Sequence, residues 1–271
     1  MRITAEKVDF SAFEPQNVTV EIRAYMLGLI YCLGEPCIDI RGKKIVYLAL
    51  NEEYGYCINW LFRNIRRRRT YNIPYNTYKI IFEDDDFYEL ILSMRGADEA
   101  RFPRLPFDMR RHFFRAYFDV TSEYTMTTQI AHAQKTNKAR IHNIYSLKVF
   151  TTGQQFTYDF ISALSLILQP TPLYVQPRTL EKTIGEYYLR WLTRDRIVII
   201  LYQLYHDSKY HRKSKYEEAK ELVEKNHLYK QGVLTDPDFF VHGESRVHIQ
   251  RRPVKLEDLD EEEFDDELED F

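Results

Sequence analysis

The chain has 271 residues, 44% of them hydrophobic, so it is long enough to bury a full core in one large domain or two small ones. We expect neither a membrane helix nor a secretory signal, because no apolar run of about 18 residues occurs and no basic-then-apolar segment opens the chain. The cysteines Cys32, Cys37 and Cys57 have no CxxC spacing, which favours reduced thiols in an intracellular protein.

The net charge of −3 conceals an uneven distribution along the chain. The last 16 residues, 256–271, contain 11 acids and no lysine or arginine, so the rest of the chain has 30 acids against 38 bases. A body with this excess of positive charge favours a polyanionic partner such as nucleic acid.

After a leader over residues 1–17, helix-like and strand-like patterns alternate along the chain. Apolar residues at helical spacing predict helices, and period-two alternation predicts strands. The residues Arg41-Gly42-Lys43 between the first two strands are typical of a turn. In order, the patterns predict a helix over 18–32, strands over 38–40 and 45–49, a helix over 52–65, a strand over 78–82 and a helix over 84–94.

The same order then recurs, which predicts two similar units related by a pseudo-twofold axis in an α+β fold. The second set is a helix over 106–118, strands over 124–130 and 139–147, a helix over 154–168, a strand over 184–191, and helices over 197–205 and 215–225. The expected parts of the chain are the leader, a first repeat over 18–105, a second repeat over 106–227, an extension over 228–255 and an acidic tail over 256–271.

Two segments resemble the signature helix of the LAGLIDADG homing endonuclease family. Residues 26–34 have the sequence MLGLIYCLG, and residues 114–122, which begin 88 positions later, have the sequence FRAYFDVTS. With the order of the elements, they make residues 18–225 similar to the two-repeat, single-chain type of this family. The resemblance implies a monomer of two αββαββα repeats whose signature helices pack together, with Gly28 and Ala116 permitting a close approach.

The resemblance also implies a nuclease site with one carboxylate at the eighth position of each signature helix, where the pair holds divalent metal ions. Those positions are occupied here by Leu33 and Thr121, and neither side chain is a carboxylate ligand for Mg²⁺. We therefore expect no catalytic residue, no metal and no other cofactor. Glu35 and Glu123 are candidates for displaced acids, which would require Mg²⁺, and Asp119 is expected to have a structural role.

In the family that the chain resembles, duplex DNA lies across a saddle made by the two sheets. Outward strand residues contact bases and turn residues contact phosphates. The four consecutive arginines at 66–69 are the densest basic run, and a solvated helix end is the alternative interpretation for them. The candidate DNA-binding residues are Arg41, Lys43, Lys44, Arg66, Arg67, Arg68, Arg69, Lys79, Lys135, Lys138, Arg140, Lys148, Arg178, Lys182 and Arg190.

The acidic tail has too few apolar residues to fold alone. Phe264, Leu268 and Phe271 are candidate anchors for a protein partner. The alternatives are a solubility tail and a segment that competes with DNA for the basic saddle.

Taken together, these patterns predict an intracellular, sequence-selective double-stranded DNA-binding protein that derives from a homing endonuclease and does not cleave DNA. Transcription regulation is one role that would suit it. The alternatives are an active LAGLIDADG homing endonuclease with displaced acids, an RNA-binding, maturase-like splicing cofactor and a protein-interaction adaptor. A membrane partner is not expected.

Overall fold

The computed structural model describes residues 19–58, 69–72, 77–83, 85–95, 102–103, 105–132, 139–167, 187–192, 194–226 and 230–232. The leader and the acidic tail both lie outside these ranges. Among the residues described, no helix is long and apolar enough to cross a membrane.

The first half of the chain forms one antiparallel sheet with helices on one side. Its elements are α1 (Val20–Leu33), β1 (Glu35–Ile38), β2 (Lys44–Asn51), the 3-10 helix η3 (Glu52–Tyr54), β3 (Arg69–Asn72), β4 (Thr77–Phe82) and α3 (Asp85–Arg95). The four strands have the order β1-β2-β4-β3. The helix predicted over 52–65 begins as η3 and is α-helical at residues 55–58, and the remainder falls outside the described residues.

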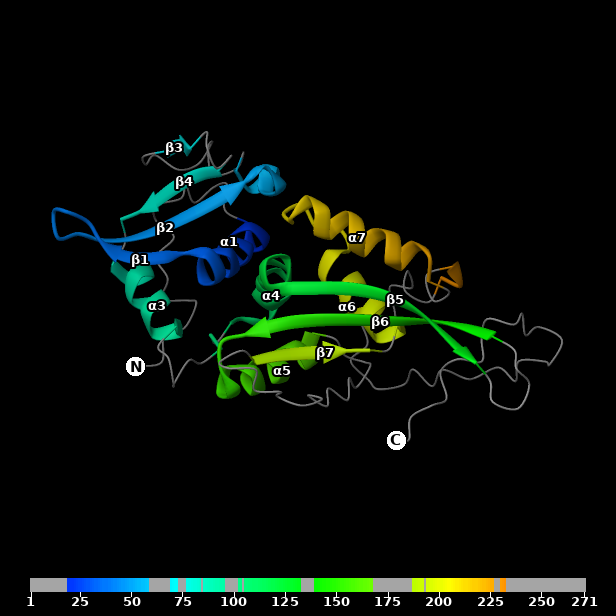
Figure 1. Cartoon of the computed structure of the whole chain (residues 1–271). Helices are drawn as coiled ribbons and strands as arrows, with labels where there is room; N and C mark the ends of the chain where they lie inside the picture. Colours follow the sequence, from blue (N-terminus) through cyan, green and yellow to red (C-terminus); the bar gives the residue numbers. More distant parts are fainter. Residues whose placement is uncertain are drawn as a thin grey trace.

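The second half forms another antiparallel sheet, with the order β5-β6-β7. Its elements are α4 (Phe107–Thr121), β5 (Ser122–His132), β6 (Ala139–Thr151), α5 (Gln154–Ile167), β7 (Tyr187–Trp191), α6 (Arg194–Tyr205) and α7 (Lys213–Glu224). The predicted α+β class is confirmed. Figure 1 shows the two sheets on either side of α1 and α4, with α3 against the first sheet and α5 and α6 against the second.

The sequence sets the ends of α1. The hydroxyl of Thr19 accepts a hydrogen bond from the backbone N–H of Ile22, and Glu21 lies in the first turn, where the helix dipole favours an acid. The helix ends at Gly34, whose extended backbone donates to the carbonyl of Ile30 at 2.8 Å. Residues 24–30 between these ends are all buried, as expected of a helix that packs against other elements on every side.

Close approach of α1 and α4 depends on the missing side chain of Gly28. A Cβ atom at this position would lie 2.6 Å from the Cβ of Ala116 and 2.8 Å from the carbonyl oxygen of Phe113. Both neighbours belong to the middle of α4, and Ala116 is fully buried. The predicted contact between the two signature-like helices is therefore confirmed, and the space between them has no room for a methyl group.

Gly28→Ala is expected to lower the free energy of unfolding by about 1–3 kcal/mol, because overpacking against Phe113 and Ala116 outweighs the gain in helix propensity. Gly55→Ala is the matched control, since no atom lies within 4 Å of a Cβ there and its backbone is helical. We expect the control to raise stability by about 0.5–1 kcal/mol in chemical denaturation. Equal changes in the free energy of unfolding for Gly28→Ala and Gly55→Ala would contradict the close approach of α1 and α4.

Candidate nucleic-acid interface

Buried and exposed side chains alternate along the strands of the first sheet, which gives the sheet one face covered by helices and one open face. Leu48 and Leu50 of β2 and Ile80 of β4 are buried beneath the helices, while Ala49 and Lys79 are exposed. Ala49 and Lys79 are paired across the two strands, so the Lys79 side chain extends from the open face. Lys79 is the predicted DNA-binding residue that the structure places at the centre of this face.

The open face of the second sheet carries a row of charged residues on three neighbouring strands. Glu123 of β5 pairs with Lys148 of β6, and Lys148 pairs with Arg190 of β7. Leu147 and Val149, on either side of Lys148 in sequence, are buried against the helices, which fixes the row on the opposite face. The structure thus brings together Lys148 and Arg190, two predicted DNA-binding residues that lie 42 positions apart in sequence.

Neighbouring polar and aromatic groups position these two cations. The Nε of Arg190 donates to the hydroxyl of Ser146 at 2.9 Å, and the Nζ of Lys148 lies 5.6 Å from the centre of the Tyr188 ring. Ser146 and Tyr188 were not among the predicted site residues. The period-two alternation of β7 and β6 would have indicated them, because it places Tyr188 with Arg190 and Ser146 with Lys148.

The turn between β1 and β2 presents Arg41 to solvent. The carboxylate of Asp39 accepts hydrogen bonds from the backbone N–H groups of Lys43 and Arg41, at 2.9 and 2.8 Å, and these bonds lower its pKa. Gly42 has a φ of 77°, a left-handed conformation that suits glycine. The Nζ of Lys43 lies 3.1 Å from the carboxylate of Glu83, the residue after β4, so this lysine forms an ion pair at the edge of the first sheet.

Lys44 lies on the covered side of the first sheet rather than on its open face. It has the same parity in β2 as the buried residues Val46 and Leu48. Its Nζ pairs with Glu89 of α3 at 2.5 Å and lies 5.5 Å from the centre of the Tyr88 ring. The structure therefore does not bring Lys44, a predicted DNA-binding residue, together with Lys79, because α3 reaches this end of β2.

Several predicted residues cannot be placed in this interface. For Arg69 in β3 and Arg140 in β6 only the backbone is described. The predicted residues outside the described part of the chain are Arg66, Arg67, Arg68, Lys135, Lys138, Arg178 and Lys182, together with the tail anchors Phe264, Leu268 and Phe271.

The side chains at the ends of α1 and α4 do not fit a metal ion. Leu33 is partly buried and packs against the hydrophobic core, and the hydroxyl of Thr121 donates to the carbonyl of Tyr117 at 2.8 Å. Glu35 and Glu123 are exposed at the beginnings of β1 and β5. Within the described residues, no three His, Cys, Asp or Glu side chains are grouped as metal ligands.

Asp119 is fully buried near the end of α4 and is held by three donors from other parts of the fold. The hydroxyls of Tyr25 and Tyr205 each donate to its carboxylate at 2.6 Å, and the backbone N–H of Arg212 donates at 2.8 Å. Burial raises the pKa of Asp119 to about 6, although these hydrogen bonds favour the charged form. The carboxylate therefore has a structural role that joins α1, α4, α6 and the segment before α7.

The raised pKa of Asp119 predicts a specific pH dependence of stability. Ionisation costs more in the folded than in the unfolded state, so the free energy of unfolding rises as the pH falls through about 6. From pH 7 to pH 5 this group contributes an increase of about 1 kcal/mol, which Asp119→Asn should remove in denaturation experiments. Asp108→Asn, which makes the same acid-to-amide replacement at an exposed position of α4, is the control for the substitution itself. The same increase in Asp119→Asn would show that another group is responsible.

The sequence matches no protein-family model and no curated protein, but the fold matches solved structures. The LAGLIDADG homing endonuclease I-LtrWI, bound to its target DNA, shares 12% identity and a TM-score of 0.52 over 80% of this chain and 94% of that chain. This chain has a LAGLIDADG-type fold. The LAGLIDADG meganuclease I-CpaMI, bound to uncleaved DNA, gives a weaker likeness, with 8% identity and a TM-score of 0.45 over 80% of this chain and 97% of that chain. At such identities the likeness concerns the fold alone.

Proposed function

We propose that this protein binds double-stranded DNA sequence-selectively on the open faces of its two sheets and does not cleave it. The observation that carries the proposal is the pairing of Lys148 with Arg190 on the open face of a LAGLIDADG-type sheet. I-LtrWI, whose fold is similar, was solved bound to its target DNA.

The side chains on the second sheet suit both parts of duplex recognition. A lysine supplies a compact charge for phosphate, and an arginine supplies two parallel donors that match the major-groove edge of guanine. Thr125 and Thr127, exposed on the same face of β5, add hydroxyls that donate to and accept from base edges. In the first half, Lys79 on the open face and Arg41 in the β1–β2 turn provide the positive charges that contact the duplex.

Substitutions in the second sheet should separate the two kinds of contact. Arg190→Ala should reduce discrimination among duplexes by about 1–3 kcal/mol, because it removes a base-edge contact. Lys148→Ala should weaken binding to all duplexes and reduce the salt slope by about 1, because fewer counterions are released. Both effects are measured by titrating duplexes selected from a random pool at several salt concentrations.

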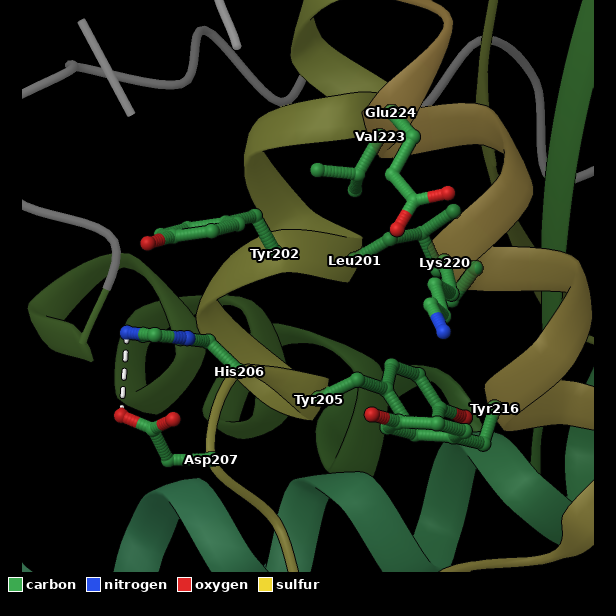
Figure 2. A pocket seen from close by; sticks show the side chains of 10 residues that line it. Leu201, Tyr202, Tyr205, His206, Asp207, Tyr216, Lys220, Val223 and Glu224 are labelled. Atoms are coloured by element: carbon green, nitrogen blue, oxygen red, sulfur yellow. Dashed lines mark ion pairs between the residues drawn. The ribbon is translucent and has the colours of Figure 1, made fainter. Parts of the chain in front are cut away.

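Lys220→Ala is the matched control for these titrations. Lys220 is exposed on α7, at a groove between α6 and α7 whose lining residues are shown in Figure 2. Its replacement removes the same charge at a position outside both sheets and should leave duplex affinity nearly unchanged. A larger loss from Lys220→Ala than from Lys148→Ala would place the DNA elsewhere on the protein.

The proposed lack of cleavage rests on the side chains at the ends of α1 and α4. Leu33 offers no oxygen, and the Thr121 hydroxyl is engaged by the carbonyl of Tyr117. In the presence of Mg²⁺ or Mn²⁺, the protein should therefore leave its selected duplex without nicks on a denaturing gel. Specific cleavage that disappears in Glu35→Gln/Glu123→Gln would instead establish an active endonuclease with displaced acids.

We further propose that the protein acts as an intracellular, monomeric DNA-binding regulator whose acidic tail recruits a protein partner through Phe264, Leu268 and Phe271. The charge contrast between the tail and the rest of the chain supports this role. Preference for a structured RNA over every selected duplex would favour the maturase-like alternative.

A further inference from the structure

The segment over residues 206–214, which we call the brace, connects α6 to the first turn of α7 and contacts helices from both halves of the chain. Asp207 lies in the turn after α6 and has a left-handed φ of 55°. Figure 2 shows its carboxylate beside the imidazole of His206, at 3.0 Å. After this turn, the N-terminal end of α7 packs near η3 of the first half.

On the side of the first half, the brace is held by two glutamates. Glu53 of η3 accepts a hydrogen bond from the backbone N–H of Ser214 at 2.9 Å, and its carboxylate lies 3.7 Å from the Nε of Arg212. Glu21 of α1 accepts from the backbone N–H of Lys209 at 2.9 Å. The ring of His211 adds an edge contact with Tyr56, at 5.9 Å between ring centres.

On the side of the second half, the brace is held by α4. The carboxylate of Asp119 accepts from the backbone N–H of Arg212 at 2.8 Å. The fully buried Arg115 donates to the carbonyl of Tyr210 at 2.7 Å, and its guanidinium also pairs with Glu21 at 2.6 Å. Arg212 thus joins both halves, since its backbone N–H donates to Asp119 of α4 and its side chain contacts both Glu53 of η3 and the carbonyl of Asp119.

The position of the brace determines which relative motions of the two halves it opposes. Gly28 and Ala116 bring the backbones of α1 and α4 into close contact, and rotation of one helix against the other is opposed most by contacts that lie far from this point. Glu21 is seven residues before Gly28 on α1, which corresponds to about 10 Å along the helix axis. Contacts this far from the crossing oppose rotation of one half, with its sheet, against the other.

We propose that the brace fixes the angle between the two sheets and thereby the spacing between the two halves of the duplex that they bind. Arg212 and Glu53 are its positioning residues. The effect on spacing rests on the proposed function, whereas the effect on the angle does not. The exposed fractions of the Arg212 and Glu53 side chains are 33% and 36%, so both lie at the edge of the packed core rather than within it.

The angle is tested without DNA. Spin labels are introduced at Arg41, exposed in the turn between β1 and β2, and at Thr127, exposed on β5, through non-canonical amino acids so that the native cysteines remain. Pulsed electron paramagnetic resonance then gives the distribution of distances between the two labels. Arg212→Ala and Glu53→Ala should broaden or shift this distribution, while the controls Glu52→Ala on η3 and Glu217→Ala on α7 should match the parent. An unchanged distribution in both brace variants would overturn the proposal.

The spacing is tested with the tightest-binding duplex selected from a random pool, lengthened or shortened by one base pair at its centre. Each such change moves the half-sites by about 3.4 Å and rotates them. The parent should lose at least about tenfold in affinity, equal to about 1.4 kcal/mol, and Arg212→Ala should lose markedly less.

Equal losses in the parent and Arg212→Ala would overturn the role of the brace in specificity, even if the label distances broaden. Failure to select any duplex would contradict the proposed function instead, and the label distances would still decide whether the brace sets the angle. Glu53→Gln, which keeps an acceptor for Ser214, covers the case in which an alanine variant does not fold.

Discussion

The close contact between α1 and α4 is the constraint on which the rest of the structure depends. Gly28 has no side chain, so the backbones of the two helices approach so closely that a Cβ atom at this position would overlap with α4. Each helix packs against the sheet of its own half, so the contact between the helices joins the two sheets. The contact between α1 and α4 thereby joins the half that carries Lys79 to the half that carries Lys148 and Arg190, as the proposed binding to a continuous duplex requires.

Two charged side chains are buried beside this contact, and their hydrogen bonds explain how the core accommodates them. Arg115 and Asp119 are fully buried, and an isolated buried charge would cost several kcal/mol. Each is instead satisfied by donors or acceptors from α1, α6 and the brace. These hydrogen bonds require a defined arrangement of four separate segments, so they contribute to the specificity of the fold as well as offsetting the burial.

The sequence predicted the elements of the fold and part of the candidate site because both depend on local periodicity. Lys79 and Lys148 alternate with buried residues, which indicates that they face outward. The same parity rule applied to Lys44 would have grouped it with Val46 and Leu48. The contacts that hold the brace were not predictable, because they join positions as distant as Glu21 and Lys209 through backbone N–H groups, which nearly every residue type has. The engagement of the Thr121 hydroxyl follows from ordinary helix geometry, but the sequence alone does not show whether it occurs.

Chemical footprinting of lysines is the most direct test of the claim that the open sheet faces bind duplex DNA. The protein is acetylated with and without a duplex selected from a random pool, and modification is quantified by mass spectrometry. The account predicts that the duplex protects Lys79 and Lys148, while Lys213 and Lys220 of α7 react equally in both samples. Protection of the α7 lysines with no protection of Lys79 and Lys148 would contradict it.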